Sequence, residues 1–442
     1  MKKISSTVRL LSALSAAVLS VAGATPAVAG STGSPDQNQP ASASVLNADD
    51  PSLGADVNGD GRADIVGFGE AATYVSLGRT NGTFAPSKRS PEANFSYALG
   101  WRVGVHLRLL GDVNGDKRAD TVAFGNASTY VALGQSDGTF SLPKKFNEYS
   151  LAQGWTLSKH VRLLADVNGD GRADIVAFGN SATYVSMGQA NGTFAGAKKS
   201  PGANFSYDQG WRVGVHLRLL GDVNGDKRSD IVAFGNTATY VALGQSNGTF
   251  ADAKKFNEYS IAQGWTLGKH LRQLADVNGD SRTDIVAFGN TAAYVALGQA
   301  NGNFATSKKS PGDFSYAQGW RVDKHIRFLA DVNGDRRADI VGFGDKATYV
   351  ANGQSNGTFS TAFKAVSQFS IAQGWTLDRN PRALGDMNGD NRADIVGISD
   401  RATHVATYDT QKKAFVVKPG GLSEFSLAQG WQVGRHVRIL VG

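Results

Sequence analysis

The sequence contains no cysteine and only three methionines in 442 residues. Without cysteine the chain can form neither a disulfide nor a thiolate metal site, and no thiol can act as a nucleophile. No segment after residue 29 is apolar enough to cross a bilayer, which takes about 20 apolar residues. No stretch has the apolar period of an amphipathic helix either. Stability must therefore come from packing between non-helical elements, with hard metal ions as the other available source.

Blocks of charge are also absent. The 45 Lys and Arg residues and the 38 Asp and Glu residues give a net charge of +7, and the basic residues are spread through the chain without forming an arm or a patch. Nucleic-acid-binding proteins usually concentrate their positive charge on one face or segment. We therefore expect no nucleic-acid partner, and we expect no membrane-spanning segment in the mature protein.

The N-terminus has the three parts of a secretory signal. Lys2, Lys3 and Arg9 form a basic start, an apolar segment follows, and the small-residue sequence Ala-Val-Ala ends at Ala29. A transmembrane helix is the alternative, but the apolar segment is shorter than a helix that spans a bilayer. The sequence predicts a bacterial-type signal peptide over residues 1–29, cleavage after Ala29 and a secreted protein.

Residues 30–50 are polar and rich in Pro, Ser and Gln, and we interpret them as a disordered leader. The chain as a whole is rich in glycine, with 54 residues or about 12%, against about 7% in average proteins. This composition predicts many tight turns between short strands in the folded part of the chain, residues 51–442.

One motif, Asp-x-Asn-Gly-Asp, divides the folded part into seven units. Its copies follow one another at intervals of 54 to 56 residues and start at Asp56, Asp112, Asp166, Asp222, Asp276, Asp331 and Asp386. One tryptophan follows each copy: Trp101, Trp155, Trp211, Trp265, Trp320, Trp375 and Trp431. Such a constant period indicates repeated supersecondary units. Units one, three and five share a Ser-Pro segment that units two and four lack, which suggests duplication of a two-unit block.

Each unit contains four runs rich in β-branched and aromatic residues, as residues 160–211 illustrate. The runs "HVRLLADV" and "ADIVAFG" flank the acidic motif, "ATYVSMGQ" follows, and an Asn-Gly turn precedes a fourth short run. Four antiparallel strands repeated seven times are typical of an all-β, seven-bladed β-propeller. An open solenoid is the alternative, but it would need distinct polar caps at both ends.

The two ends of the folded part favour a closed ring. The chain ends in "HVRILVG", which is the strand that precedes the acidic motif in other units, whereas the first motif is preceded only by "DDPSLGA". We therefore expect the C-terminal strand to complete the first blade and to close the ring.

The acidic motif supplies only oxygen ligands, from Asp, Asn, Asp and Asp at positions 1, 3, 5 and 9 of each loop. Ca2+ takes about six to eight oxygen ligands in flexible geometry, whereas Mg2+ requires a stricter octahedron. An Asx-turn without metal is the alternative, but three carboxylates within nine residues repel one another unless a cation lies between them. We predict up to seven structural Ca2+ ions, held by Asp56, Asn58, Asp60, Asp64, Asp112, Asn114, Asp116, Asp120, Asp166, Asn168, Asp170, Asp174, Asp222, Asn224, Asp226, Asp230, Asp276, Asn278, Asp280, Asp284, Asp331, Asn333, Asp335, Asp339, Asp386, Asn388, Asp390 and Asp394.

A second repeated cluster surrounds each tryptophan, as in "FSYDQGWRVGVHLR" around Trp211. A histidine follows the tryptophan in six units, and Asn380 replaces it in the sixth. An arginine recurs in all seven: Arg108, Arg162, Arg218, Arg272, Arg327, Arg382 and Arg438. In a structural interpretation Trp packs between blades, His satisfies a backbone group and Arg binds a carboxylate or a carbonyl oxygen. In the alternative the cluster is a binding site, because an aromatic face beside hydrogen-bond donors suits a sugar ring.

The segment "FSYAQGWRVDKHIRFLADVNGDRRADIVGFG", residues 314–344, resembles the repeat of fungal propeller lectins of the Psathyrella velutina type. These lectins lie within the FG-GAP/VCBS repeat group, which includes the integrin alpha-chain head, and the resemblance covers about residues 56–442. It implies binding of N-acetylglucosamine-type terminal sugars in pockets between consecutive blades, with structural calcium and no catalysis.

The resemblance implies sugar contacts at matching positions: Tyr97, Trp101, Arg102, His106, Tyr207, Trp211, Arg212, His216, Tyr316, Trp320, Arg321, His325, Trp155, His160, Trp265, His270, Trp431 and His436. The even units depart from the pattern, because aliphatic residues stand at the Tyr position and threonines at the Arg position: Leu151, Ile261, Ile371, Thr156, Thr266 and Thr376. The seventh unit has Leu427 and Gln432 there. We therefore expect sugar binding to reside mainly in the odd units.

The sequence thus predicts a secreted, monomeric, multivalent lectin for glycans or glycoconjugates that carry N-acetylated sugars. A protein-binding or adhesion propeller without sugar specificity is the alternative, because propellers host many functions. A polysaccharide-active enzyme is less well supported: a glycosidase needs two dedicated carboxylates at a defined separation, and the acidic loops take up 21 of the 38 acidic residues. We expect no enzymatic activity.

Overall fold

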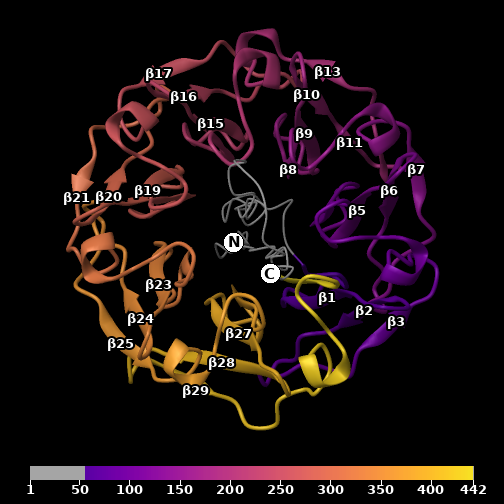
Figure 1. Cartoon of the computed structure of the whole chain (residues 1–442), viewed down its shortest axis with the longest axis vertical. Helices are drawn as coiled ribbons and strands as arrows, with labels where there is room; N and C mark the ends of the chain where they lie inside the picture. The colour runs from indigo at the N-terminus through magenta and orange to yellow at the C-terminus, as the bar shows by residue number, and fades with distance from the viewer. Residues whose placement is uncertain (1–54, 442) are drawn as a thin grey trace, which may run out of the picture.

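The structure, a computed structural model, describes residues 55–441 as seven four-stranded antiparallel sheets arranged in a ring (Figure 1). Each sheet runs from an innermost strand near the axis to an outermost strand at the rim. Apart from short 3-10 turns, the described residues form no helix. The predicted all-β, seven-bladed propeller is confirmed. The predicted signal peptide, the predicted leader and residues 51–54 lie outside the described part of the chain.

The first four blades have the following strands, given from the axis outward. Blade 1 consists of β30 (Val437–Val441), β1 (Asp64–Phe68), β2 (Thr73–Ser76) and β3 (Lys88–Ser90). Blade 2 consists of β4 (Arg108–Gly111), β5 (Asp120–Phe124), β6 (Thr129–Ala132) and β7 (Lys144–Phe146). Blade 3 consists of β8 (Val161–Ala165), β9 (Asp174–Phe178), β10 (Thr183–Ser186) and β13 (Lys198–Lys199), with a small hairpin of β11 (Gly188–Gln189) and β12 (Thr193–Phe194). Blade 4 consists of β14 (Leu217–Gly221), β15 (Asp230–Phe234), β16 (Thr239–Ala242) and β17 (Lys254–Phe256).

The last three blades repeat this order. Blade 5 consists of β18 (Leu271–Ala275), β19 (Asp284–Phe288), β20 (Ala293–Ala296) and β21 (Lys308–Lys309). Blade 6 consists of β22 (Arg327–Ala330), β23 (Asp339–Phe343), β24 (Thr348–Ala351) and β25 (Phe363–Val366). Blade 7 consists of β26 (Arg382–Gly385), β27 (Asp394–Ile398), β28 (Thr403–Asp409) and β29 (Ala414–Val417). The 3-10 turns are η1 (Tyr97–Leu99), η2 (Leu151–Gln153), η3 (Pro201–Ala203), η4 (Tyr207–Gln209), η5 (Ile261–Gln263), η6 (Tyr316–Gln318), η7 (Ile371–Gln373) and η8 (Leu427–Gln429).

The C-terminal strand closes the ring. β30 pairs antiparallel with β1, with Ile439 opposite Val66, and so becomes the innermost strand of blade 1. A second contact joins consecutive blades, because the backbone N–H of Ala119 in blade 2 donates to the carbonyl oxygen of Asp56 in the preceding acidic loop at 2.8 Å. The same bond recurs around the ring and spans the closure as well, from the Ala63 N–H to the Asp386 carbonyl at 2.8 Å.

The hydrophobic core lies between neighbouring blades. Successive side chains of a strand point to opposite faces, so Leu110 of β4 packs with Phe68 of blade 1 while Leu109 packs with Ile175 of blade 3. Each innermost strand therefore contributes to two interfaces, which is how the repeats bury their apolar residues without helices.

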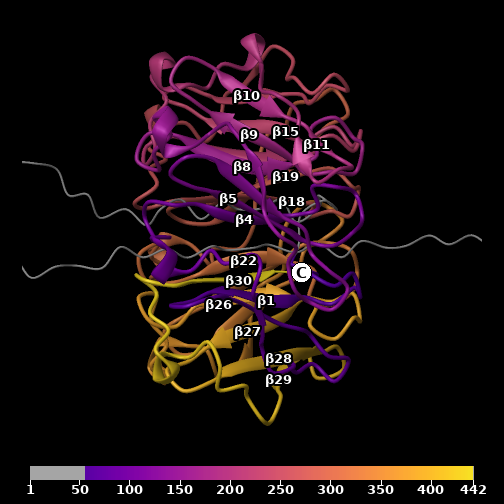
Figure 2. The same cartoon turned by 90° about the vertical axis from the view of Figure 1, so that its right-hand side faces the viewer.

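The two repeated clusters lie on opposite faces of the ring. In blade 2, His106 precedes β4 by two residues and Asp112 follows it directly. Strands run between the two faces when the ring is seen edge-on (Figure 2). We call the side with the acidic loops the loop face and the side with the tryptophans the tryptophan face. Among residues 55–441, no helix is long and apolar enough to cross a membrane.

Candidate functional site

The acidic loops fold around their own first carboxylate. In the loop of blade 2, Asp112 accepts the backbone N–H of Gly115 at 2.7 Å on Oδ1 and the N–H of Lys117 at 2.7 Å on Oδ2. Lys117 reaches this position with a φ of 68°, in the left-handed region that short loops often use. The carboxylate at position 1 thus satisfies the amide groups that the curl of the loop turns inward.

The carboxylate at position 9 is buried and ties the loop to a neighbouring hairpin. Asp120 accepts the N–H of Val113 at 2.9 Å on one oxygen and the N–H of Gly134 at 2.9 Å on the other. Burial is the main reason why the pKa of Asp120 lies well above its usual range, and the charges of Asp112 and Asp116 raise it further. In blade 3 the same effect raises the pKa of Asp174 to about 8.

An arginine at position 7 forms an ion pair with the carboxylate at position 5 of each loop, a contact that the sequence did not predict. Arg118 forms an ion pair with Asp116 and donates from Nε to the Gly134 carbonyl at 2.7 Å. This arginine was recognisable in the sequence, because every loop has one: Arg62, Arg118, Arg172, Arg228, Arg282, Arg337 and Arg392.

Calcium fits these loops by chemistry, because the predicted ligands are all oxygen atoms. In the described geometry, however, the carboxylates at positions 1 and 9 accept backbone N–H groups and the one at position 5 binds arginine. Among residues 55–441 no group of three or more His, Asp or Glu side chains is placed to hold a metal ion. The carboxylates of the loops are thus paired with groups of the protein in the described residues, and calcium binding stays a prediction.

On the tryptophan face, a short 3-10 turn positions each tryptophan. In blade 1, η1 ends at Gly100, whose φ of 90° is left-handed and allows the chain to reverse. The indole of Trp101 then lies edge-on to Phe95, with ring centroids 5.0 Å apart, and contacts the imidazole of His106 at 5.1 Å. The tryptophans thus pack between blades: Trp211, Trp320 and Trp375 are buried, and Trp101, Trp155, Trp265 and Trp431 are half-buried.

The buried arginine of each innermost strand supports this packing. Arg108 donates from Nη1 to the carbonyl of Phe95 at 3.2 Å, and its guanidinium lies 5.4 Å from the ring of Phe68 and 6.0 Å from the ring of Trp101. Of the two predicted partners, carboxylate or carbonyl, the carbonyl is the one found. Burial lowers the pKa of Arg108 to about 10, so the side chain stays charged at neutral pH.

Both ring nitrogens of the histidine are used within the protein. His106 accepts the backbone N–H of Arg102 on Nδ1 at 3.0 Å, and its Nε2 lies 3.0 Å from Oδ1 of Asn126. Burial lowers the pKa of His106, and these partners together favour the neutral ring with the proton on Nε2. The partner of Nε2 is the residue after the Phe-Gly pair in each unit, for example Asn126, Asn180, Asn236 and Asn290.

Asn380 keeps the same two connections where histidine is missing. Its Oδ1 accepts the backbone N–H of Thr376 at 3.2 Å, and its Nδ2 donates to Asp400 at 3.1 Å. The group on the opposite turn has changed from Asn to Asp, which accepts the amide. The connection that histidine makes in six units is therefore kept in the sixth unit by Asn380, in agreement with the structural interpretation. The predicted contact of the histidines with sugar stays a prediction.

In the odd units the predicted Tyr and Arg come together by stacking on each other. The guanidinium of Arg102 lies 3.6 Å from the ring centre of Tyr97, and that of Arg435, from the last unit, lies 3.9 Å from the same ring. Tyr207 and Tyr316 are flanked likewise by an arginine of their own unit and a lysine of the preceding one, Lys159 or Lys269. These cations from the preceding unit were not predicted, because only the ring arrangement brings them to the tyrosine.

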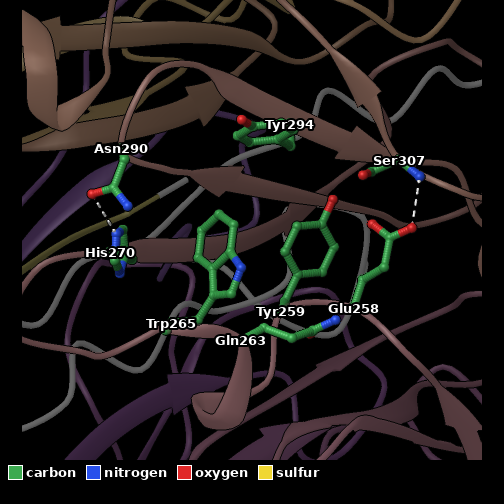
Figure 3. A pocket seen from close by; sticks show the side chains of 9 residues that line it. Glu258, Tyr259, Gln263, Trp265, His270, Asn290, Tyr294 and Ser307 are labelled. Carbon is green, nitrogen blue, oxygen red and sulfur yellow. Dashed lines mark hydrogen bonds between the residues drawn. The ribbon is translucent and has the colours of Figure 1, made fainter.

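A pocket of about 300 Å³ opens on the tryptophan face between blades 4 and 5, at an even unit. Figure 3 shows Trp265 in its middle, with His270 and Asn290 on one side and Tyr259 and Glu258 on the other. Gln263, Gly264, Tyr294 and Ser307 complete the lining. This size lies at the lower end of the range for small-molecule sites. The sequence favours the odd units, where arginine stacks on tyrosine, whereas this pocket lies at an even unit, which has Thr266 at the arginine position.

Of the residues that line this pocket, Trp265 and His270 were predicted and the others were missed. The signal was present as "FNEYS", which occurs only in units two and four. It supplies Glu258, whose Oε1 accepts the backbone N–H of Ser307 at 3.1 Å and so joins blade 4 to blade 5. Tyr259 lies edge-on to Trp265, with ring centroids 5.0 Å apart.

The structure of an Agrocybe aegerita lectin is 37% identical to this chain with a TM-score of 0.81, and the match covers 86% of this chain and 96% of that lectin. The chain belongs to this family of propeller lectins. That structure is described as the basis of specific recognition of non-reducing terminal N-acetylglucosamine. The family described as FG-GAP-like repeat matches residues 112–177 and 331–397 of this propeller lectin. Both results confirm the predicted family, and membership of a lectin family agrees with the expectation of no enzymatic activity.

Other similarities are weaker. A comparison with curated proteins gives no match. A chain of the Photorhabdus luminescens Tc holotoxin pore is 17% identical, with a TM-score of 0.44, over 84% of this chain and 18% of that chain. The Vibrio cholerae biofilm matrix protein Bap1 is 12% identical, with a TM-score of 0.26, over 90% of this chain and 68% of that chain. These values carry no argument about function.

Proposed function

We propose that this propeller lectin is secreted and binds glycans that end in N-acetylglucosamine-type sugars, in pockets between consecutive blades on the tryptophan face. The pocket between blades 4 and 5 is the observation that carries the proposal. It combines an aromatic wall of Trp265, Tyr259 and Tyr294 with the polar side chains of Asn290 and Ser307. Such a combination suits a sugar, whose C–H face packs on aromatic rings while its hydroxyl and amide groups form hydrogen bonds.

The repeated architecture supports a multivalent mode of binding. Each junction between blades presents one tryptophan cluster, and the ring closes within a single chain. Several weak sites on one rigid molecule gain avidity for a surface that carries many copies of the sugar. We propose that the protein acts as a monomer and that its specificity for a glycan surface comes from this multiplicity.

A glycan array with the mature chain tests the proposal. We expect binding to glycans with terminal N-acetylglucosamine and none to the same glycans after removal of that sugar. Trp265→Ala removes the aromatic wall of the pocket and should reduce the signal, while a surface substitution on the loop face, Lys117→Ala, should leave it unchanged. Silence across all N-acetylated sugars would overturn the proposal and favour the alternative of a protein-binding propeller.

Secretion and calcium complete the proposal. The basic and apolar segments of residues 1–29 support secretion, and N-terminal sequencing of the exported protein tests cleavage after Ala29. The oxygen-only composition of the seven loops supports structural calcium. So does the raised pKa of Asp120, which results mainly from burial and to a smaller extent from the charges of Asp112 and Asp116.

A further inference from the structure

The seven junctions between blades differ at one aromatic position of the tryptophan face. The position is the one directly before the serine that precedes each 3-10 turn with an adjoining tryptophan. Five junctions have phenylalanine there, namely Phe95, Phe205, Phe314, Phe369 and Phe425, and two have tyrosine, Tyr149 and Tyr259. All seven side chains are buried and lie 5.0 Å, between ring centroids, from the tryptophan of the same junction. Only two junctions therefore carry a phenolic hydroxyl at this position.

The two tyrosines have different partners on the adjoining blade. The hydroxyl of Tyr149 lies 2.8 Å from Oγ of Ser186, the last residue of β10. At the corresponding end of β20, blade 5 has Ala296, which offers no hydroxyl. The hydroxyl of Tyr259 is buried and forms no hydrogen bond in the described structure.

The pocket between blades 4 and 5 differs from its counterpart at a second position. Ser307 of blade 5 lines this pocket, whereas Ala197 occupies the same place beside Glu148 in blade 3. Burial raises the pKa of the Tyr259 phenol, and the Ser307 side chain partly offsets this rise, although the two hydroxyls do not reach hydrogen-bonding geometry. Ser307 and Tyr259 both line the pocket beside Trp265 (Figure 3).

We propose that the pocket between blades 4 and 5 is the strongest sugar site of the ring and that the Tyr259 hydroxyl determines its specificity by donating a hydrogen bond to an oxygen atom of the sugar. This inference rests on the proposed lectin function. At the junction of blades 2 and 3, the Tyr149 hydroxyl already forms a hydrogen bond with Ser186, so a sugar there gains no comparable bond.

The physical reason is that a buried hydroxyl without a partner destabilises the empty site. A sugar oxygen that accepts its proton removes this penalty and adds a hydrogen bond, so binding gains more than at a site whose hydroxyl is already paired. The same logic gives selectivity, because an analogue that lacks the accepting oxygen leaves the hydroxyl unpaired in the complex.

N-acetylglucosamine binding to the full mature chain tests the inference, with occupancy read site by site in crystals soaked at graded sugar concentrations and affinity measured by calorimetry. Tyr259→Phe should weaken this pocket by roughly three- to tenfold, the worth of one hydrogen bond. Ala296→Ser should weaken it similarly, because it recreates the pairing of Tyr149 with Ser186. Both variants should fold, since Phe and Ser occupy these positions at other junctions.

The matched changes at the other junction complete the design. Ser186→Ala should strengthen the site between blades 2 and 3, whereas Tyr149→Phe should leave its affinity unchanged. Binding by the wild type with equal occupancy in Tyr259→Phe overturns this inference and leaves the lectin function standing. Absence of N-acetylglucosamine at every junction of the wild type overturns both.

Discussion

At the scale of single residues, the histidine of the tryptophan cluster acts as a connector between two turns. It accepts a backbone N–H from the turn after the tryptophan and reaches the side chain that follows the Phe-Gly pair of the next blade. The sixth unit makes the same connection with Asn380. What the position requires is therefore an acceptor and a donor at a fixed separation, and imidazole is one way to supply them.

The first prediction follows from this comparison. His106→Ala leaves the Arg102 N–H and the Asn126 side chain without their partners and should lower the free energy of unfolding by about 1–3 kcal/mol, the usual cost of a buried unsatisfied polar group. His106→Asn should cost less, because asparagine can supply both bonds as Asn380 does. Thermal and denaturant unfolding of the two variants measure the difference; equal losses would contradict the connector role.

The same residue gives a prediction about pH. Burial lowers the pKa of His106, so the unfolded chain takes up a proton more readily than the folded protein does. The stability contributed by the neutral ring is present above the ordinary histidine pKa, about 6.5, and is lost as the pH falls below it. We therefore expect the stability difference between the wild type and His106→Asn to shrink between pH 7.5 and pH 5.5; a constant difference would show that the ring does not titrate in this range.

At the scale of elements, the acidic loops are turns that also touch the next loop. Gly59 and Gly61, at positions 4 and 6 of the first loop, both have a left-handed φ, of 78° and 81°. A Cβ on Gly59 would lie 3.1 Å from Cγ of Arg118 in the following loop, whereas a Cβ on Gly61 would meet nothing within 4 Å. Position 6 already carries Lys117 in blade 2 with a φ of 68°.

This contrast yields a matched pair of substitutions. Gly59→Ala and Gly61→Ala share the cost of a left-handed alanine, about 1–2 kcal/mol, but only Gly59→Ala also presses on the side chain of Arg118 in the next loop. We expect the first variant to lower the melting temperature more than the second. An equal loss in calorimetry would mean that the contact between loops adds nothing to the strain of the turn itself.

At the scale of the whole molecule, the seven loops form one connected ring on the loop face, because each is bonded through its backbone to the next, including the pair across the closure. A change in every loop at once therefore acts on all blade junctions together. The tryptophan face is divided differently, since each tryptophan cluster belongs to one junction and its residues vary from unit to unit.

Binding or removal of calcium would act on all seven loops at once. Burial raises the pKa of the carboxyl at position 9, to about 8 in Asp174. Without metal, the folded protein therefore binds more protons than the unfolded chain between the ordinary pKa of aspartate, about 4, and this raised value. The folded protein loses stability as the pH rises through that range. A cation bound to the ionised groups opposes this loss. We expect chelation to lower the melting temperature, more at pH 8 than at pH 5, and added Ca2+ to restore it; a melting curve that is indifferent to both at pH 8 would overturn the calcium proposal.

The repeated pattern by itself determined the architecture of this protein. The sequence predicts the blades and their number from the interval of 54 to 56 residues, the β-branched runs and the Asn-Gly turns. These features depend on nearby residues alone, and each of the seven copies repeats them. The C-terminal strand predicts the closure for the same reason: the unit it completes lacks only that element.

The tertiary structure alone decided how the tryptophan face is used. Residues that form one junction come from two blades and are distant in the sequence: Arg379 and Asp400 are 21 positions apart, and Glu258 and Ser307 are 49 positions apart. Sequence matching therefore predicted Trp265 and His270 of the pocket between blades 4 and 5, but it favoured the odd units and missed Tyr259 and the lining residues from blade 5. Whether that hydroxyl is paired depends on a serine or an alanine at the end of a strand in the next blade, a relation that exists only once the blades are packed side by side.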